Sequence, residues 1–158
     1  MCYTTLMHKS FYASGFLYSV KAHKILLLQS PAKDDLASSW TMLGGEGNEG
    51  EEAQLAFQRI VRENLDVDLK VDHIYPIYDY FHNDLDTTNY VFYAEVKQPQ
   101  DFKSDKENAP LWVSFAETVK LLLSGHTKQD VIVGERVISA KWRIDTGQQV
   151  LETLQKVL

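Results

Sequence analysis

The chain has 158 residues, 44% of them hydrophobic, which fits one domain over residues 1–158 with a substantial core. Its net charge of -6 excludes general nucleic-acid binding, because no excess of Lys and Arg exists to replace the counterions of a phosphate backbone. The single cysteine, Cys2, is typical of a reducing compartment. No apolar run approaches the ~18 residues of a membrane span, and the N-terminus lacks the order of a signal peptide. We therefore expect a cytoplasmic protein that does not enter a membrane.

The first third of the chain reads as strands followed by a loop. Residues 11–20 are rich in aromatic and β-type residues, and residues 24–29 form a short apolar run suited to a buried strand, so the two predict a hairpin. Pro, Asp and Ser indicate a loop over residues 30–39. Gly44 and Gly45 then begin a glycine-rich acidic loop. The glycines allow positive φ and close backbone approach.

Residues 51–65 predict one amphipathic helix. Its apolar residues recur at steps of three and four, which is the pattern of a buried stripe. The stripe consists of Ala53, Ala56, Phe57, Ile60, Val61 and Leu65. Ile60, Glu63 and Asn64 stand at i, i+3 and i+4, so they share a face of this helix.

The rest of the chain alternates between extended and helical patterns. We expect a long or bent strand over residues 67–80, with Pro76 at a kink, and a second strand over 88–96, with a turn over 82–86 between them. A polar loop over 97–110 and a short apolar piece over 111–115 should follow. We then expect helices over 116–123, 128–139 and 147–158. We expect the last helix to pack on the domain. The order of strands, helix, strands and helices predicts an α/β (α+β) fold, a mixed sheet covered by helices on both faces.

A motif joins the glycine-rich loop to the helix. Five residues separate Gly45 from Glu51, and seven separate Glu51 from Arg59. This arrangement resembles the Nudix hydrolase superfamily, whose box reads G-x5-E-x7-R-E-U-x-E-E-x-G-U with U aliphatic. The positions that match are Gly45, Glu51, Arg59, Val61, Glu63 and Val67. The strand before the box, Trp40 and Trp112 are also similar to the family, so the resemblance extends over about residues 11–123.

The resemblance implies a Nudix-like mixed β-sheet sandwiched between α-helices. It also implies a pyrophosphatase that hydrolyses a nucleoside diphosphate derivative, a small phosphorylated nucleotide-like substrate, with Mg²⁺ or Mn²⁺ bound weakly as cofactor. The residues to which it assigns these roles are Glu63, Arg59 and Glu51 in catalysis, Gly44 and Gly45 in substrate binding, and Glu63, Asn64 and the Gly44 carbonyl as metal ligands.

The box departs from the family at the positions that matter most for metal binding. Ile60 and Asn64 stand where the family has glutamates, so one carboxylate of three remains on that helix face. Asp66 replaces the glycine before Val67, and Leu43 replaces a proline. These departures predict a hydrolase weakened by the loss of box glutamates. The alternative is a catalytically inactive Nudix-fold module that binds a nucleotide or a protein partner.

Other carboxylates could replace those missing from the helix. Glu107 in the polar loop is one, Asp66 one turn further along the helix is another, and the loop residues Glu46, Glu49 and Glu52 are the rest. The simpler interpretation of the loop residues is solvated surface. Similarly, Glu51 and Arg59 are either catalytic or an ion pair that holds the turn.

Two further expectations concern ligands and partners. The aromatic residues Tyr78, Tyr80, Phe81 and Tyr90 either stack on a base or are buried in the sheet. A homodimer is a further expected assembly, since many open-sheet domains of this size pair.

Overall fold

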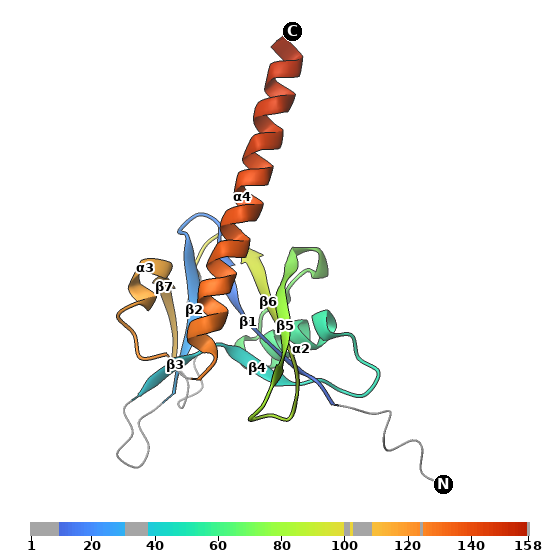
Figure 1. Cartoon of the computed structure of the whole chain (residues 1–158), viewed down its shortest axis with the longest axis vertical. Coiled ribbons are helices and arrows are strands. Elements are labelled where there is room, and N and C mark those ends of the chain that lie inside the picture. Colours follow the sequence, from blue (N-terminus) through green and yellow to red (C-terminus); the bar gives the residue numbers. More distant parts are fainter. Residues whose placement is uncertain (1–9, 31–37, 100–101, 103–108, 124, 158) are drawn as a thin grey trace.

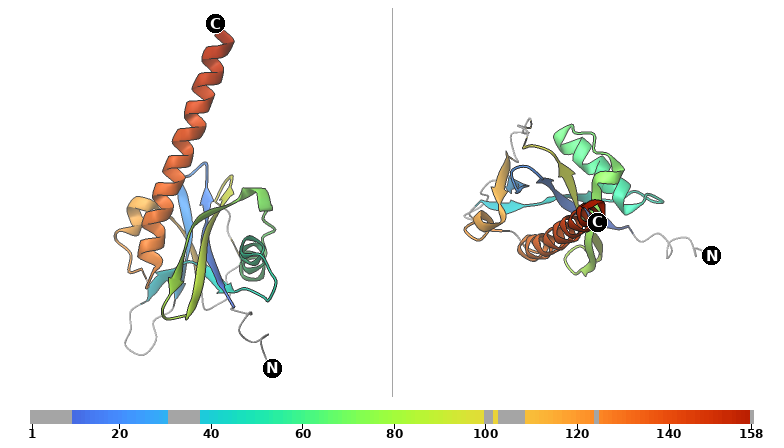
Figure 2. Two further views of the ribbon diagram at one scale, coloured as in Figure 1. Left: turned by 45° about the vertical axis from the view of Figure 1, so that its right-hand side comes forward. Right: turned by 90° about the horizontal axis from the view of Figure 1, so that it is seen from above.

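The computed structural model describes residues 10–30, 38–99, 102, 109–123 and 125–157. A seven-stranded mixed sheet lies between helix α2 on one face and helix α4 on the other (Figures 1 and 2). This confirms the predicted α+β fold with helices on both faces of the sheet.

The strands and helices follow one another in the predicted order. The strands are β1 (Tyr12–Ser19), β2 (Lys24–Ser30), β3 (Ser39–Thr41), β4 (Leu43–Glu46), β5 (Ile74–His82), β6 (Thr87–Val96) and β7 (Ala109–Ser114). The helices are α2 (Ala53–Leu65), the 3₁₀ turn η1 (Val71–His73), α3 (Phe115–Thr118) and α4 (Thr127–Val157).

Strand β1 is the centre of the sheet. It pairs with β6 in parallel along its whole length, with the start of β2 in antiparallel at one end, and with β4 in antiparallel at the other. Strands β5 and β6 form an antiparallel hairpin, while β2 also pairs with β3 and β7. The glycine pair of β4 is therefore fixed against the most central strand of the sheet.

The core has two halves because side chains of a strand alternate between the two faces of the sheet. On β1, Ala13 and Leu17 pack with the cluster beneath α2, whereas Phe16 and Tyr18 pack with the cluster beneath α4. The apolar run of β2 divides in the same way, and four consecutive residues are buried, from Ile25 to Leu28. An uninterrupted hydrophobic strand is what a sheet covered on both faces requires.

Helix α2 forms where the apolar stripe predicts it. Phe57 is fully buried and stacks on Phe92 of β6, with 5.8 Å between ring centroids. The helix ends at Asp66, which adopts the left-handed conformation with φ 55° and ψ 40°. The Asp66 N–H donates to the Arg62 carbonyl at 2.9 Å and so satisfies one of the last carbonyls of the helix.

Two other expectations need correction in their bounds. Strand β5 begins at Ile74 rather than at residue 67, because residues 71–73 form a 3₁₀ turn; the expected kink is confirmed as a bulge between Pro76 and Tyr78. The helix expected over residues 116–123 spans only Phe115–Thr118.

The C-terminal region is one continuous helix where two were expected. The last buried residue of α4 is Ile138, and the helix then extends away from the domain, as Figure 1 shows. Trp142, Ile144, Leu151 and Leu154 each have more than half of their surface exposed. The expectation that this tail packs on the domain is therefore wrong. In the part of the chain that the structure describes, no helix is apolar enough over a sufficient length to cross a membrane.

The left-handed conformation of Asp66 leads to a prediction. Asp66→Gly should raise the free energy of unfolding by ~0.5–1 kcal/mol, because glycine pays no steric penalty at positive φ. Urea unfolding of the two proteins measures this difference. Asp66→Ala is the control at the same position: it also removes the carboxylate but keeps the β-carbon, and it should give no increase. Equal stabilisation by both variants would assign the effect to charge instead.

Candidate functional site

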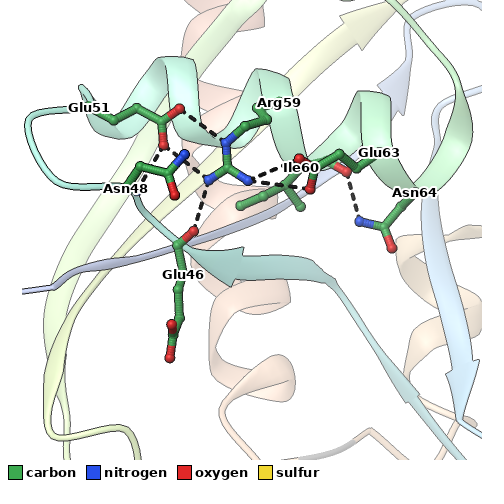
Figure 3. A network of polar contacts seen from close by, with 7 residues as sticks. All are labelled: Glu46, Asn48, Glu51, Arg59, Ile60, Glu63 and Asn64. Atoms are coloured by element: carbon green, nitrogen blue, oxygen red, sulfur yellow. Dashed lines mark hydrogen bonds and ion pairs between the residues drawn. The ribbon is translucent and has the colours of Figure 1, made fainter.

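Arg59 connects the acidic loop to helix α2 (Figure 3). Its Nε donates to Glu51 Oε2 at 3.1 Å, and its Nη2 donates to Glu51 Oε1 at 3.0 Å. Nη2 also donates to the backbone carbonyl of Glu46 at 2.9 Å, and Nη1 lies 3.3 Å from both carboxylate oxygens of Glu63. The structure thus brings the three residues expected in catalysis, Glu51, Arg59 and Glu63, into one network.

The loop itself is closed around Glu51. The Asn48 N–H donates to Glu51 Oε1 at 3.0 Å, and the Glu51 N–H donates back to the Asn48 carbonyl at 3.0 Å. Gly50 completes the turn with φ +76°, a conformation that favours glycine. The hydrogen bonds from Arg59 lower the pKa of Glu51, partial burial opposes this, and the Asn48 N–H adds to the lowering. Glu51 is therefore held as a carboxylate that fixes the loop, which is the ion pair expected on structural grounds.

The helix face expected to bind metal carries one carboxylate. Ile60 is 2% exposed and packs against Gly45, where an added β-carbon would lie 3.2 Å from the Ile60 side chain. The Asn64 amide nitrogen donates to the Ile60 carbonyl at 2.7 Å, within the helix. The side chain of Glu63 is 60% exposed and in contact with Arg59. This face can offer a cation Glu63 and the amide oxygen of Asn64.

The two glycines of β4 face opposite sides of the sheet. Gly45 faces α2, whereas Gly44 faces Tyr12 and Ser14 of β1 and lines a cavity on the α4 side. Side chains at both positions would collide with or crowd their neighbours, so the strand passes closely between the helix and the cavity. Two consecutive residues of β4 therefore face the cavity and α2, on opposite sides of the sheet.

The cavity has a volume of about 250 Å³ and is lined mainly by polar and aromatic side chains. Its lining includes Tyr12, Ser14, Thr41, Met42, Tyr80, His82, Asp84, Asn89, His126 and Asp130. At its base Asp130, 2% exposed, accepts hydrogen bonds from the hydroxyls of Tyr78 at 2.6 Å and Tyr80 at 3.2 Å. Asn89 donates to the Tyr80 hydroxyl at 3.2 Å and accepts from Ser14 at 2.9 Å.

Burial dominates the electrostatics of this cavity. Burial raises the pKa of Asp130, and the hydrogen bonds from Tyr78 and Tyr80 oppose that rise. Burial, with the charge and hydrogen bond of Asp130, raises the pKa of Tyr80 to about 12, although the hydrogen bond from Asn89 lowers it. The Tyr80 hydroxyl therefore stays protonated and remains a donor at neutral pH.

The other carboxylates named from the sequence are dispersed. The side chain of Glu46 extends away from Arg59 and α2 (Figure 3), and its charge adds to burial in raising the pKa of Tyr12. Glu49 and Glu52 are exposed in the loop and at the helix start, and Asp66 caps the helix end. Glu107 lies outside the described residues.

Of the four aromatic residues considered for base stacking, one lines the cavity. It is Tyr80. Tyr78 lies outside the cavity lining and donates its hydroxyl hydrogen bond to Asp130. Phe81 is 58% exposed, and Tyr90 packs edge-on against Phe11 beneath α2.

Sequence reasoning missed the residues that α4 and the β5–β6 hairpin bring to this cavity. Asp130 lies in a helical pattern and looks like an exposed acid, and His126 precedes it by four residues. The one local signal is Asp130 itself, an acid followed directly by the apolar residues Val131 and Ile132. The partners of Asp130 lie about fifty residues earlier in the chain, so no local pattern identifies them.

Comparison with known proteins places the chain in a family. The model of the NUDIX domain matches residues 11–133, and the chain belongs to this family. No sequence among curated proteins matches it.

Solved structures share the fold at identities that support the fold alone. The NUDIX domain of Shewanella oneidensis NrtR, in complex with ADP ribose, is 15% identical with a TM-score of 0.68, covering 87% of this chain and 94% of that one. A C. elegans Ap4A hydrolase is 16% identical with a TM-score of 0.61, covering 82% and 98%. The C-terminal domain of mouse MUTYH, in complex with human PCNA, is 16% identical with a TM-score of 0.63, covering 83% and 90%.

The lowered pKa of Glu51 predicts how stability depends on pH. Its pKa is lower in the folded than in the unfolded state, so its ion pair stabilises the fold above the unfolded value of about 4.3 and is lost as the pH falls through the folded value. Glu51→Gln should lower the free energy of unfolding at pH 7 by ~1 kcal/mol or less. Urea unfolding of both proteins between pH 7 and pH 3 should show the two stabilities converging in acid.

Glu52→Gln is the control for the loss of one acidic charge beside the same helix. A difference between wild type and Glu51→Gln that persists undiminished at pH 3 would show that the Glu51 carboxylate charge does not hold the loop.

Proposed function

We propose that the protein is a Nudix-type hydrolase of a nucleoside diphosphate derivative, with Mg²⁺-dependent turnover weakened by the loss of two box carboxylates. One observation supports this activity most strongly. Glu51 of the loop and Arg59 and Glu63 of α2 form one network, and Gly44 of β4 lines a polar cavity on the other side of the sheet. A ligand with one end in that cavity and a diphosphate passing over β4 would reach the exposed carboxylate of Glu63.

The donor set of α2 suits one hard cation. Magnesium and manganese bind oxygen ligands and are often held by one or two carboxylates together with substrate phosphates. Glu63, the amide oxygen of Asn64 and the carbonyl of Gly44 are the groups we assign to it; Glu63 is exposed and reachable. When bound there, the ion would neutralise charge on the phosphate oxygens and lower the pKa of a bound water. Ile60 stands at the position of a box glutamate and is buried, so it gives this face no second carboxylate. We therefore do not expect a two-metal site.

The chain's own groups would position the substrate. Arg59 orients the carboxylate of Glu63 through two contacts of 3.3 Å, and Glu51 orients Arg59 in turn. We assign substrate binding to Gly44, which lines the cavity, and to its neighbour Gly45, beside which Ile60 fills the space on the α2 side. In the cavity, the ring of Tyr80 and the side chain of Asn89 offer a stacking surface and hydrogen bonds to a base or a sugar.

A second candidate function is a catalytically inactive module that binds a nucleotide or a protein partner. The contact between Glu63 and Arg59 favours it, because the one remaining carboxylate is already neutralised by a guanidinium. The comparisons include precedents for both kinds of binding: a NUDIX domain in complex with ADP ribose, and the C-terminal domain of MUTYH in complex with a protein, PCNA.

We also propose that the protein forms a homodimer through the distal half of α4. Ile144, Leu151 and Leu154 are exposed and recur at steps of seven and three. This is the spacing at which one helix contacts another in a coiled coil. A second copy of the helix would cover the same residues.

A cytoplasmic location and a single domain over residues 1–158 stay predictions from the sequence.

Metal binding and turnover test the hydrolase. Calorimetric titration with Mg²⁺ or Mn²⁺ should give millimolar-or-better affinity, and a phosphate-release screen over nucleoside diphosphate derivatives should give slow turnover. Glu63→Gln should lower both affinity and kcat/KM by at least about tenfold, because it removes the only carboxylate of that face. Glu152→Gln, on the distal half of α4, removes an acid far from α2 and should change neither.

Asn64→Glu adds a carboxylate at an exposed position and should raise turnover. By contrast, Ile60→Glu would bury a charge and is unsuitable as a gain-of-function test. Absence of metal binding and of product in both wild type and Asn64→Glu would overturn the hydrolase. Binding of ADP ribose without metal in that case would support the inactive module.

The dimer has its own test. Sedimentation equilibrium should show a dimer for the wild type and a monomer for Leu151→Glu with Leu154→Glu, because paired acids cannot be buried between two helices. Gln149→Glu adds a charge on the opposite side of the helix and should leave the dimer intact. A monomeric wild type at high micromolar concentration would contradict dimerisation through α4.

A further inference from the structure

Three side chains that bind metals in other proteins meet at the wall of the cavity on the α4 side of the sheet. His82 ends β5, Asp84 lies in the turn that follows, and His126 directly precedes α4. One potential ligand atom from each lies within 4.8 Å of the other two. None of these residues belongs to the Nudix box, and none is on α2.

Two parts of the fold position these three side chains: the turn of the β5–β6 hairpin and the start of α4. The hairpin closes with His82 opposite Thr87, and its turn is held by the Leu85 N–H donating to the His82 carbonyl at 3.2 Å. Asp84 is therefore kept beside His82. On the other side, the Asp130 N–H donates to the His126 carbonyl at 2.9 Å in the first turn of α4. The two imidazole rings lie with centroids 4.1 Å apart and planes at 60°.

The chemistry of this donor set differs from that of the box. Two imidazole nitrogens and one carboxylate suit Zn²⁺ and neighbouring first-row divalent ions, whereas Mg²⁺ prefers oxygen ligands alone. Around a tetrahedral ion with bonds of about 2.0 Å, donor atoms lie about 3.3 Å apart. The ligand atoms lie within 4.8 Å of one another, so each pair would need to close by at most about 1.5 Å through rotations of the three side chains.

The surroundings supply two further observations. His82 Nδ1 is buried without a hydrogen-bond partner among the described residues, and buried polar atoms normally have one. Behind the cluster, the buried carboxylate of Asp130 is fixed by Tyr78 and Tyr80. Its charge is close enough to His82 and His126 to interact with both. The nearby negative charge of the Asp130 carboxylate would favour a cation bound between the two imidazoles.

We propose that His82, Asp84 and His126 bind a divalent ion of the zinc class, with the remaining coordination position open to the cavity. Three protein ligands and one open position are the arrangement of a site that accepts water or an anionic oxygen from a ligand. A phosphate or carboxylate oxygen of whatever occupies the cavity could take that position. The site does not depend on hydrolysis at α2, since no residue is shared between them.

Titration of the full chain with Zn²⁺ and Co²⁺ tests this site. The Cys2→Ser background removes the one thiol that could compete for these ions. After removal of bound metal, calorimetry should give one site of micromolar or better affinity. Co²⁺ should develop the visible absorption of a low-symmetry site, and the melting temperature should rise with either ion, because a ligand that binds only the folded state stabilises it.

Single substitutions assign the ligands. His126→Ala and Asp84→Asn should each weaken Co²⁺ binding at least tenfold and reduce the absorption, with the circular dichroism spectrum unchanged. The matched control is His73→Ala, since His73 is exposed in η1 and takes no part in the cluster. Glu63→Gln should also leave Co²⁺ binding as in wild type.

The outcomes that overturn the site are equally definite. The proposed metal site is overturned when the wild type binds neither Zn²⁺ nor Co²⁺ below millimolar concentration. Equal loss of affinity in His73→Ala and His126→Ala would also overturn it, because it would indicate adventitious binding to surface imidazoles. Loss of binding in Glu63→Gln but not in His126→Ala would place the ion on α2 instead.

Discussion

The guanidinium of Arg59 is the group on which the geometry of the box depends. The acidic loop is fixed to α2 by the hydrogen bonds that Arg59 makes to the Glu51 carboxylate and to the Glu46 carbonyl. A planar fork of donors can satisfy both partners at once, which a lysine ammonium cannot do with the same geometry. The same guanidinium also neutralises Glu63. Any cation at Glu63 would compete with this Nη1 contact, whereas the bonds from Arg59 Nε and Nη2 that anchor the loop do not involve Glu63.

The loss of the two box glutamates has different structural consequences at the two positions. Ile60 has become part of the core: it fills the space above Gly45 and joins the cluster beneath α2. Asn64 has stayed on the surface and bonds to the backbone of its own helix. Replacing Ile60 with glutamate would disrupt this packing and lower stability, whereas replacing the exposed Asn64 with glutamate would not. At Ile60 the chain therefore has apolar burial where the family's box has a glutamate.

The sequence predicted the parts of the structure that depend on local patterns. The aromatic and β-type residues of β1, the apolar run of β2, the stripe of α2 and the spacing from Glu51 to Arg59 all act over short stretches of chain, and they predicted the first strands, the helix and the ion pair. The cavity could not be foreseen, because Asp130 meets Tyr78 and Tyr80 only through the docking of α4 on the sheet. The two C-terminal helical patterns were read correctly as helix, but nothing local distinguishes a helix that packs from one that projects.

The length of α4 sets the domain apart from a simple sandwich. Ile138 is its last buried residue, and Lys141 still contacts Glu95 and Tyr75 of the sheet. The 14 residues from 144 to 157 follow, and at about 1.5 Å each they span about 21 Å. Their backbone amides are protected from hydrogen exchange only by the helix itself, whereas those near Val131 are also protected by the core. The helix thus consists of a part that opens with the whole domain and a part that opens alone. The cavity lies at the first turn of α4, in the part that opens with the whole domain.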